Sequence, residues 1–387
     1  MDIKRILNYE TRRKQARALL SENGISEQEY DTFLLKAAEK DNSDMLRFIL
    51  LAGANIEATT YDGSTSLHLA AQKGYMTNVE LLIDCGANIN AQDDQGLTPL
   101  YNAAADGHTN TVKLLLERGA NFNQTNNMGA TPLLTAAFYG HTAVVRELVE
   151  YGANIKNINN TNNHPLFAAT QKGHVDTVEE LLKKGANIEA KSSDGLTALS
   201  IAALHDQPEV AKLLLDYGAD LVAKNNLGHD ALCVAAHKGH VSTAMVLLKH
   251  GAKLDLSEKK ACTTIIIAAA IEGNTSALIT LLDHGVDIES KEETRGATPL
   301  IVAASEGNNA IIMALLEKGA NIDATTRYGE SALFFAVHFG HLDTVQALLK
   351  AGINPQTKNI EGDTAYNIAV NTGQQDIAKA IKLASNL

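Results

Sequence analysis

The chain has 387 residues, 45% of them apolar and 20% charged, which is typical of a folded protein and excludes a wholly disordered chain. Its 33 lysines and arginines against 45 aspartates and glutamates give a formal net charge of −12, so neither nucleic acid nor an anionic membrane is expected as the main partner. Aromatic residues make up only 5% of the chain and tryptophan is absent, so the core must consist of Leu, Ile, Val and Ala.

The cysteines and the apolar runs indicate where the protein resides. The first residues, MDIKRILNYETRRKQ, lack the apolar segment of a secretory signal, and the apolar run 265–271 is far shorter than the ~20 residues that span a bilayer. Three cysteines without a CxxC pair cannot build a disulfide framework. We therefore expect a cytoplasmic protein that is not inserted in a membrane, with no cofactor and no bound metal.

Residues 1–29 are predicted to form a helical capping segment that precedes the rest of the fold. The helix is expected over 2–23, ended by Asn23-Gly24, and Ser26 with Glu29 forms a capping box for the next helix. Its basic stretch, Arg12-Arg13-Lys14 with Arg17, is either a solvated face or a targeting or phosphate-contacting patch, and we favour the solvated face. The apolar residues expected to dock on the following helices are Ile3, Ile6, Leu7, Ala16, Leu19 and Leu20.

From residue 30 onward, glycines recur with a fixed period. A Gly-Ala pair returns every 33 residues from Gly53 to Gly251, and related pairs follow at Gly285, Gly319 and Gly352 with steps of 34, 34 and 33. Two further glycine series, beginning at Gly63 and Gly74, keep the same phase. Such a period indicates a repeat architecture in which each unit packs on its neighbours.

Each unit is predicted to contain two short helices and a loop. In the unit from Gly96, Thr98 is a good N-cap and Pro99 suits the first helical position. Gly107 ends this first helix, and the second helix (112–116) carries an apolar face at helical spacing. A polar stretch up to Gly129 then forms a hairpin-like loop.

These motifs resemble the ankyrin repeat. The units GSTSLHLAAQKGYMTNVELLIDCGA from Gly63 and GLTPLYNAAADGHTNTVKLLLERGA from Gly96 carry the family pattern, and eleven such units cover residues 30–387. The resemblance implies an all-α solenoid of stacked helix-turn-helix units, capped at both ends and monomeric. One position of the second helix is apolar in ten units, from Leu50 to Leu349, but Lys382 occupies it in the last, which predicts a C-terminal cap.

Some units depart from the pattern. Asn162 replaces a loop glycine and is the residue that best tolerates a left-handed backbone. Asp206 replaces a turn glycine, and Cys262 is expected to replace another loop glycine. The loops 251–262 and 285–296 are each one residue longer than the others, so we expect a local change of loop shape there without a break in the stack.

The thirteen histidines do not indicate a catalytic or metal site. Five of them follow the turn glycine directly, and their recurrence in successive repeats favours a structural hydrogen bond: His108, His141, His174, His240 and His341. No pattern of a nucleophilic triad, a zinc peptidase or a phosphate-binding loop is present. Cys85 and Cys233 are expected to be small packing residues.

Candidate binding residues lie at positions that the helical skeleton does not need, namely beside the loop glycine and just before the turn glycine. Two sets stand out because they contain the apolar, aromatic and basic residues that make binding hot spots. The first set is Met128, Phe138, Tyr139, Leu204, His205, Leu227, His229 and His237. The second set is Arg295, Arg327, Tyr328, His338 and Phe339. The alternative is that these are ordinary exposed residues without a binding role.

The resemblance implies a non-enzymatic scaffold that binds a partner protein through its concave face and loop tips. Two alternatives stay open, a targeting or adaptor subunit of an enzyme complex and a bacterial effector delivered into host cells. An enzyme is not expected, because only 29 residues precede the repeats.

Overall fold

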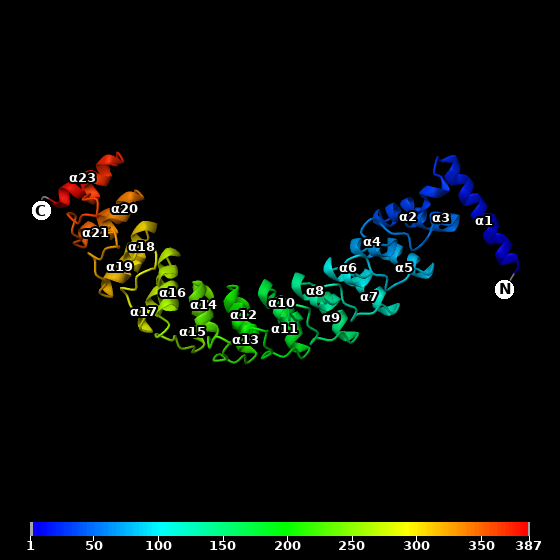
Figure 1. The fold of residues 1–387 in the computed structure, drawn as a ribbon, viewed down its shortest axis with the longest axis horizontal. Helices are drawn as coiled ribbons and strands as arrows, with labels where there is room; N and C mark the ends of the chain where they lie inside the picture. The colour runs from blue at the N-terminus through cyan, green and yellow to red at the C-terminus, as the bar shows by residue number, and fades with distance from the viewer. Residues whose placement is uncertain (1–2, 386–387) are drawn as a thin grey trace. The chain divides into compact units, whose positions relative to one another are not determined.

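The computed structural model describes residues 3–385, with the side chains from residue 9 onward, and contains 23 α-helices in this range. After α1 (Ile3–Glu22) and the short 3-10 helix η1 (Glu27–Glu29), the remaining 22 helices form eleven consecutive pairs (Figure 1). The only β-type pairing among the described residues consists of isolated bridges within loops. The all-α fold with eleven repeats is thereby confirmed.

Each repeat consists of a first helix and a second helix. The first helices of the pairs are α2 (Tyr30–Glu39), α4 (Ser66–Lys73), α6 (Pro99–Ala105), α8 (Pro132–Tyr139), α10 (Pro165–Lys172), α12 (Ala198–Leu204), α14 (Ala231–Lys238), α16 (Lys259–Ile271), α18 (Pro299–Glu306), α20 (Ala332–His338) and α22 (Ala365–Asn371). The second helices are α3 (Ser43–Ala52), α5 (Met76–Asp84), α7 (Thr109–Glu117), α9 (Thr142–Glu150), α11 (Val175–Lys183), α13 (Pro208–Asp216), α15 (Val241–Lys249), α17 (Thr275–Asp283), α19 (Asn309–Glu317), α21 (Leu342–Lys350) and α23 (Gln375–Ser385).

The chain divides into two compact units, 1–198 and 199–387. In the first unit, the first helices α2 to α10 pack on one another in sequence, and so do the second helices α3 to α11. In the second unit, α14 to α22 form the same kind of row. We call the surface formed in each unit by the first helices and the hairpin loops beside them the first-helix face.

Local sequence explains the ends of each first helix. The Thr98 hydroxyl accepts a hydrogen bond from the Tyr101 N–H at 3.1 Å, and Pro99 occupies the first helical position, as predicted. After α6, Gly107 has φ +76° and the His108 N–H donates to the Ala103 carbonyl at 2.9 Å. A left-handed residue is needed here, and it strains glycine least.

The core runs through a series of fully buried aliphatic residues in the second helices. Ile49, Leu82, Leu115 and Leu148 are each 0% exposed, and Ile381 in the last repeat is 1% exposed. The series starting at Leu50, from which the C-terminal cap is predicted, is one position away and only half-buried in most repeats. Lys382 falls in that outer series and is exposed, so the last repeat keeps its buried residue.

The hairpin loops link successive repeats through their main chains. Within a loop, the Asn126 N–H donates to the Ala130 carbonyl at 3.0 Å, which closes the turn. Between loops, the Asn127 N–H donates to the Gln95 carbonyl at 3.0 Å. Side chains add to these links, since the Asn126 Oδ1 accepts from the Ala130 N–H at 2.9 Å and the Asn127 Nδ2 donates to the Asp94 carbonyl at 3.0 Å.

Two of the three expected departures are confirmed. Asn162 adopts φ +56° and Asp206 adopts φ +51°, the left-handed region that glycine occupies in the other repeats. Asp206 also accepts a hydrogen bond from the Thr243 hydroxyl of the next repeat at 2.8 Å. The substitutions thus keep the backbone path that the repeat requires.

The prediction for Cys262 is wrong, because this residue lies within α16 and is buried. Helix α16 spans 13 residues, and it begins at Lys259, where other repeats still have a hairpin loop. The segment Glu258-Lys259-Lys260-Ala261 contains good helix formers and no glycine, so the helix extends toward its N-terminus. The loop 285–296 does carry its extra residue, since Gly296 N–H bonds to the Glu292 carbonyl four residues earlier.

Helix α1 packs against α3. Of the apolar residues expected to dock, Ala16 and Leu20 are buried, whereas Leu19 is 48% exposed and the side chains of Ile3, Ile6 and Leu7 lie outside the described residues. Arg17 is not simply solvated, because its Nε donates to the Ala52 carbonyl at the end of α3, at 2.8 Å. A cation at a helix C-terminus is stabilising. That residues 1–29 act as a cap stays a prediction.

One repeat contains a weak helix cap. His164 precedes α10 where Thr131 caps α8, but its side chain makes no capping hydrogen bond and its Nε2 is buried without a partner. Its ring lies 3.6 Å from that of Phe167, centroid to centroid, and burial lowers the pKa of His164 to about 4.

We expect His164→Thr to stabilise the fold by about 1 kcal/mol at neutral pH by restoring a cap. His164 is neutral in the folded chain and becomes protonated more readily when unfolded, so its contribution is full above pH 6.5 and is lost as the pH falls toward 4. The advantage of the variant should therefore grow over that range in urea unfolding curves. Thr131→Ala, the matched control, should lower the free energy of unfolding by about 1 kcal/mol independently of pH. If the stability difference between His164→Thr and the wild type did not change with pH, this account would be contradicted.

Candidate partner-binding surfaces

The first candidate surface lies at the end of α8 in the first unit. Phe138 and Tyr139 immediately precede the turn glycine, and their rings meet edge to face at a centroid distance of 5.2 Å. Tyr139 is 55% exposed, whereas Phe138 is half-buried, with the Lys172 ammonium 4.6 Å from its ring centroid. A cation over an aromatic face is attractive and helps to hold the ring in place.

The same arrangement recurs in the second unit at the end of α20. His338 and Phe339 occupy the equivalent positions, with ring centroids 5.0 Å apart and an interplanar angle of 87°. Phe339 is 56% exposed. In both repeats the second ring also lies beside the structural histidine, at 6.2 Å from His141 and at 6.4 Å from His341. The backbone of the repeat therefore presents two adjacent rings in one fixed geometry.

The five histidines make the predicted structural hydrogen bonds, and each of these bonds connects two repeats. The His141 Nε2 lies 2.9 Å from the Ala105 carbonyl, and the His341 Nε2 lies 2.9 Å from the Ser305 carbonyl. The corresponding distances for the other three are 2.8, 3.0 and 3.2 Å, for His108 to Gln72, His174 to Phe138 and His240 to Leu204. In repeat nine, Asn308 replaces the histidine and donates to the Ala270 carbonyl at 3.0 Å.

Loop tips supply the second kind of candidate residue. Met128, Leu227 and Tyr328 each directly precede the loop glycine and are 66%, 78% and 44% exposed. Met128 and Tyr328 contribute only their carbonyl oxygens to the links between loops, as acceptors for the N–H groups of Asn160 and Ile360. The side chains are left facing solvent.

Arg295 and Arg327 are exposed in adjacent loops, where the Arg327 N–H donates to the Arg295 carbonyl at 2.8 Å. The loop of Arg295 is held by Glu292. Although burial raises the pKa of Glu292, hydrogen bonds from the Thr294 hydroxyl and from the N–H groups of Ala297, Thr294 and Arg295 outweigh it and lower the pKa to about 2. A carboxylate that is ionised at neutral pH thus accepts several hydrogen bonds in the loop that carries Arg295.

The remaining predicted residues of the first set do not form one surface but lie in different environments. Leu204 is half-buried at the end of α12 and His205 is exposed beside it. His229 and His237 are half-buried, and their rings lie only 4.9 Å apart, centroid to centroid. These two histidines lie beside each other within one repeat, so they form a cluster that is separate from the exposed side chain of Leu227.

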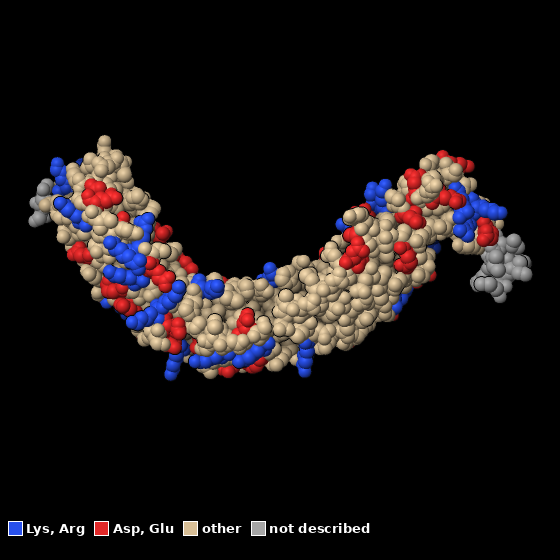
Figure 2. Space-filling model, in the orientation of Figure 1, with Lys and Arg blue, Asp and Glu red and all other residues tan. Residues whose placement is uncertain are grey.

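Charge is unevenly distributed over the first unit. Figure 2 shows few charged side chains over α7 to α10 on the face in view. The loop sequences explain this, since 121–130 contains no charged residue and 154–163 contains only Lys156. The aromatic pair of α8 therefore belongs to the same repeats as these largely neutral, asparagine-rich loops.

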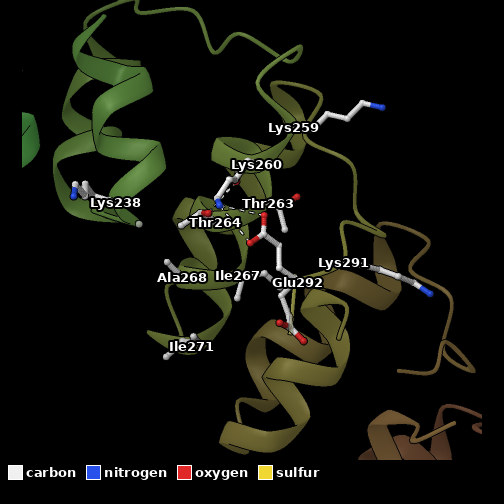
Figure 3. Close-up of a pocket in the computed structure, with 12 residues that line it drawn as sticks. Lys238, Lys259, Lys260, Thr263, Thr264, Ile267, Ala268, Ile271, Lys291 and Glu292 are labelled. Atoms are coloured by element: carbon white, nitrogen blue, oxygen red, sulfur yellow. Dashed lines mark hydrogen bonds and ion pairs between the residues drawn. The ribbon is translucent and has the colours of Figure 1, made fainter. Parts of the chain in front are cut away.

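A cavity of about 630 Å³ lies beside the extended helix α16 in the second unit (Figure 3). Its lining combines the apolar side chains of Ile267 and Ile271 with lysines of α14, α16 and the following loop. Lys260 extends to that loop, where its Nζ lies 3.2 Å from the Glu293 carboxylate, while Lys259 and Lys291 point away (Figure 3). An exposed ion pair of this kind contributes little to stability.

Two exposed residues were missed although the positional rule covers them. Tyr61 and Ile360 lie two residues before a loop glycine and are 105% and 71% exposed. The cysteine predictions are half correct, because Cys233 is buried but Cys85 is exposed. Cys85 directly follows the last residue of α5 and is the C-cap residue of that helix.

Comparison with known families agrees with the architecture. A family model of ankyrin repeats (3 copies) matches at residues 7–93, 77–159, 152–225, 221–292, 265–359 and 300–385, so the matches extend over nearly the whole chain. No curated protein matches the chain. Among residues 3–385, no helix is both long and apolar enough to cross a membrane.

Proposed function

The chain belongs to the ankyrin-repeat family, and on this premise we propose that it is a non-catalytic scaffold that binds a partner protein through the first-helix face and the hairpin loop tips. The family itself suggests protein–protein interaction. The observation that carries the finer proposal is the pair of adjacent rings at the end of α8 and again at the end of α20, in which the second ring, Tyr139 or Phe339, is more than half exposed. Aromatic residues on rigid elements are typical binding hot spots.

Each unit offers its own binding surface. In the first unit the surface consists of Met128, Phe138 and Tyr139 beside neutral loops, which suits a partner segment of low charge. In the second unit Tyr328 and Phe339 lie in the same repeat as Arg327, which suits a partner that carries acidic residues near its apolar contacts. A reducing, cytoplasmic location is part of this proposal and is supported by the exposed free thiol of Cys85.

The proposal is tested by quantitative pull-down with two double variants, Phe138→Ala with Tyr139→Ala and Tyr328→Ala with Phe339→Ala. A hot-spot ring is worth about 2 kcal/mol, so at least one double variant should weaken capture by about 30-fold or more while the circular dichroism is unchanged.

Exposed residues of the second helices provide matched controls. Tyr151 follows α9 and is 37% exposed, and Met313 on α19 is 47% exposed. Tyr151→Ala and Met313→Ala should leave capture intact, because they lie away from the first-helix face. Full capture by both double variants would refute the assignment of these surfaces.

A further inference from the structure

Four side chains with metal-binding atoms converge in the second unit at repeat seven. The side-chain ligand atoms of His229, Cys233, His237 and Glu258 all lie within 4.8 Å of one another. The His237 Nε2 is 3.5 Å from the Glu258 Oε2. A tetrahedral zinc ion with bonds of 2.0–2.3 Å holds its ligands about 3.3–3.7 Å apart, so rotamer adjustments of about an ångström would close the site around an ion.

Three different parts of the chain supply these ligands. Cys233 and His237 are four residues apart on α14, so they share one face of the helix. His229 is held at the end of the hairpin loop, where its N–H donates to the Asn225 Oδ1 at 3.0 Å.

Glu258 is the N-cap residue of α16, and it comes close because α16 extends toward its N-terminus in place of a hairpin loop. The cluster thus depends on the feature that distinguishes this repeat from the others.

The surroundings favour a cation. Cys233 is 8% exposed, and the buried Nε2 of His237 has no hydrogen-bond partner in the described structure. The carboxylates of Glu258, Asp230 and Asp255 lie close enough to Cys233 to act on it electrostatically, so negative charge is in excess around the thiol. A divalent ion would neutralise this excess and replace the missing partner of His237.

We propose that His229, Cys233, His237 and Glu258 bind one Zn²⁺ ion. Two imidazoles, a thiolate and a carboxylate are a ligand set that suits zinc, and ligands from a loop and two helices would make the site structural. On binding, the Cys233 thiol transfers its proton to solvent and its sulfur forms the metal bond. The ion would tie the loop of repeat seven to α14 and to the following repeat.

Cobalt provides a direct probe of this site. The full chain, stripped with a chelator, is titrated with Co²⁺, and we expect one ion per chain with the charge-transfer absorption of a thiolate ligand, which Zn²⁺ then abolishes by displacing the cobalt. Zn²⁺ should also raise the melting temperature of the stripped chain. The absence of a thiolate band from the wild-type chain would overturn the proposal.

Variants separate this site from adventitious binding. Cys233→Ser should abolish the thiolate band, and His229→Gln, a half-buried loop residue whose replacement leaves the helices intact, should weaken cobalt binding at least about tenfold. Cys85→Ser and His284→Gln are matched controls and should bind like the wild type. A band that persists in Cys233→Ser, or an affinity that His229→Gln leaves unchanged, would also overturn the proposal.

Discussion

Replacing Leu115 by alanine should destabilise the first unit by about 3 kcal/mol, among the largest effects of any single substitution in this chain. Leu115 is 0% exposed, and it belongs to the buried series that recurs in every second helix. Removing three carbons from such a site loses their burial and leaves a cavity, because neighbouring repeats relax only partly. The measurement is the urea midpoint followed by circular dichroism.

Leu227→Ala is the control for Leu115→Ala, since it removes the same atoms from a side chain that is 78% exposed. We expect it to change stability by less than about 0.5 kcal/mol. Equal losses from the two variants would contradict the division between buried core and free surface.

Replacing Gly107 by alanine should cost about 2–4 kcal/mol, from two separate causes. Gly107 has φ +76°, a conformation that costs an L-residue about 1–2 kcal/mol. In addition, a Cβ atom at this position would lie 2.6 Å from the Nδ1 of His141, so the imidazole must move and its bond to the Ala105 carbonyl is strained or lost. Urea unfolding measures the total.

Gly119→Ala isolates the first cause, the cost of the left-handed backbone. Gly119 has φ +88°, but a Cβ atom there would meet nothing within 4 Å, so only the backbone cost of about 1–2 kcal/mol is expected. The double variant Gly107→Ala with His141→Ala should lose less stability than the sum of the losses of the two single variants, because the clash disappears. Identical losses of stability in Gly107→Ala and Gly119→Ala would show that the structural histidines do not constrain the turns.

Much of the fold is predictable from the sequence because each position of a repeat has the same structural role in many repeats. The left-handed backbone of Asn162 and Asp206 follows from their phase with the turn and loop glycines. The structural role of the five histidines follows in the same way, although the sequence does not reveal that their hydrogen bonds join two repeats.

What the sequence did not predict arises where one repeat breaks the pattern. Cys262 was aligned with a loop glycine, but the helix-forming residues before it lengthen α16 instead. That one change brings Glu258 to Cys233 and His237, a meeting of residues 21–25 positions apart that no spacing motif describes. Likewise, the core position could not be told from its half-buried neighbour, because both are apolar in nearly every repeat.

The sequence predicts which positions of the candidate surfaces can be exposed, but not how exposed each side chain is. The rule of free positions correctly places Tyr139, Leu227 and Phe339 in solvent. It does not reveal that Phe138 is half-buried beneath the Lys172 ammonium, because that contact joins two repeats. It also does not reveal that the rings of His229 and His237 lie 4.9 Å apart, and a partner-binding role of these two residues stays a prediction.

Site-specific photocrosslinking in cell extract tests the central claim most directly. A photoreactive phenylalanine analogue is placed at Tyr139 and Tyr328 on the first-helix face, and at Tyr151 and Met313 on the second helices. The account predicts a discrete crosslinked protein from at least one of the first two positions and none from the other two. Crosslinks that form equally from all four positions, or only from the second helices, would contradict it.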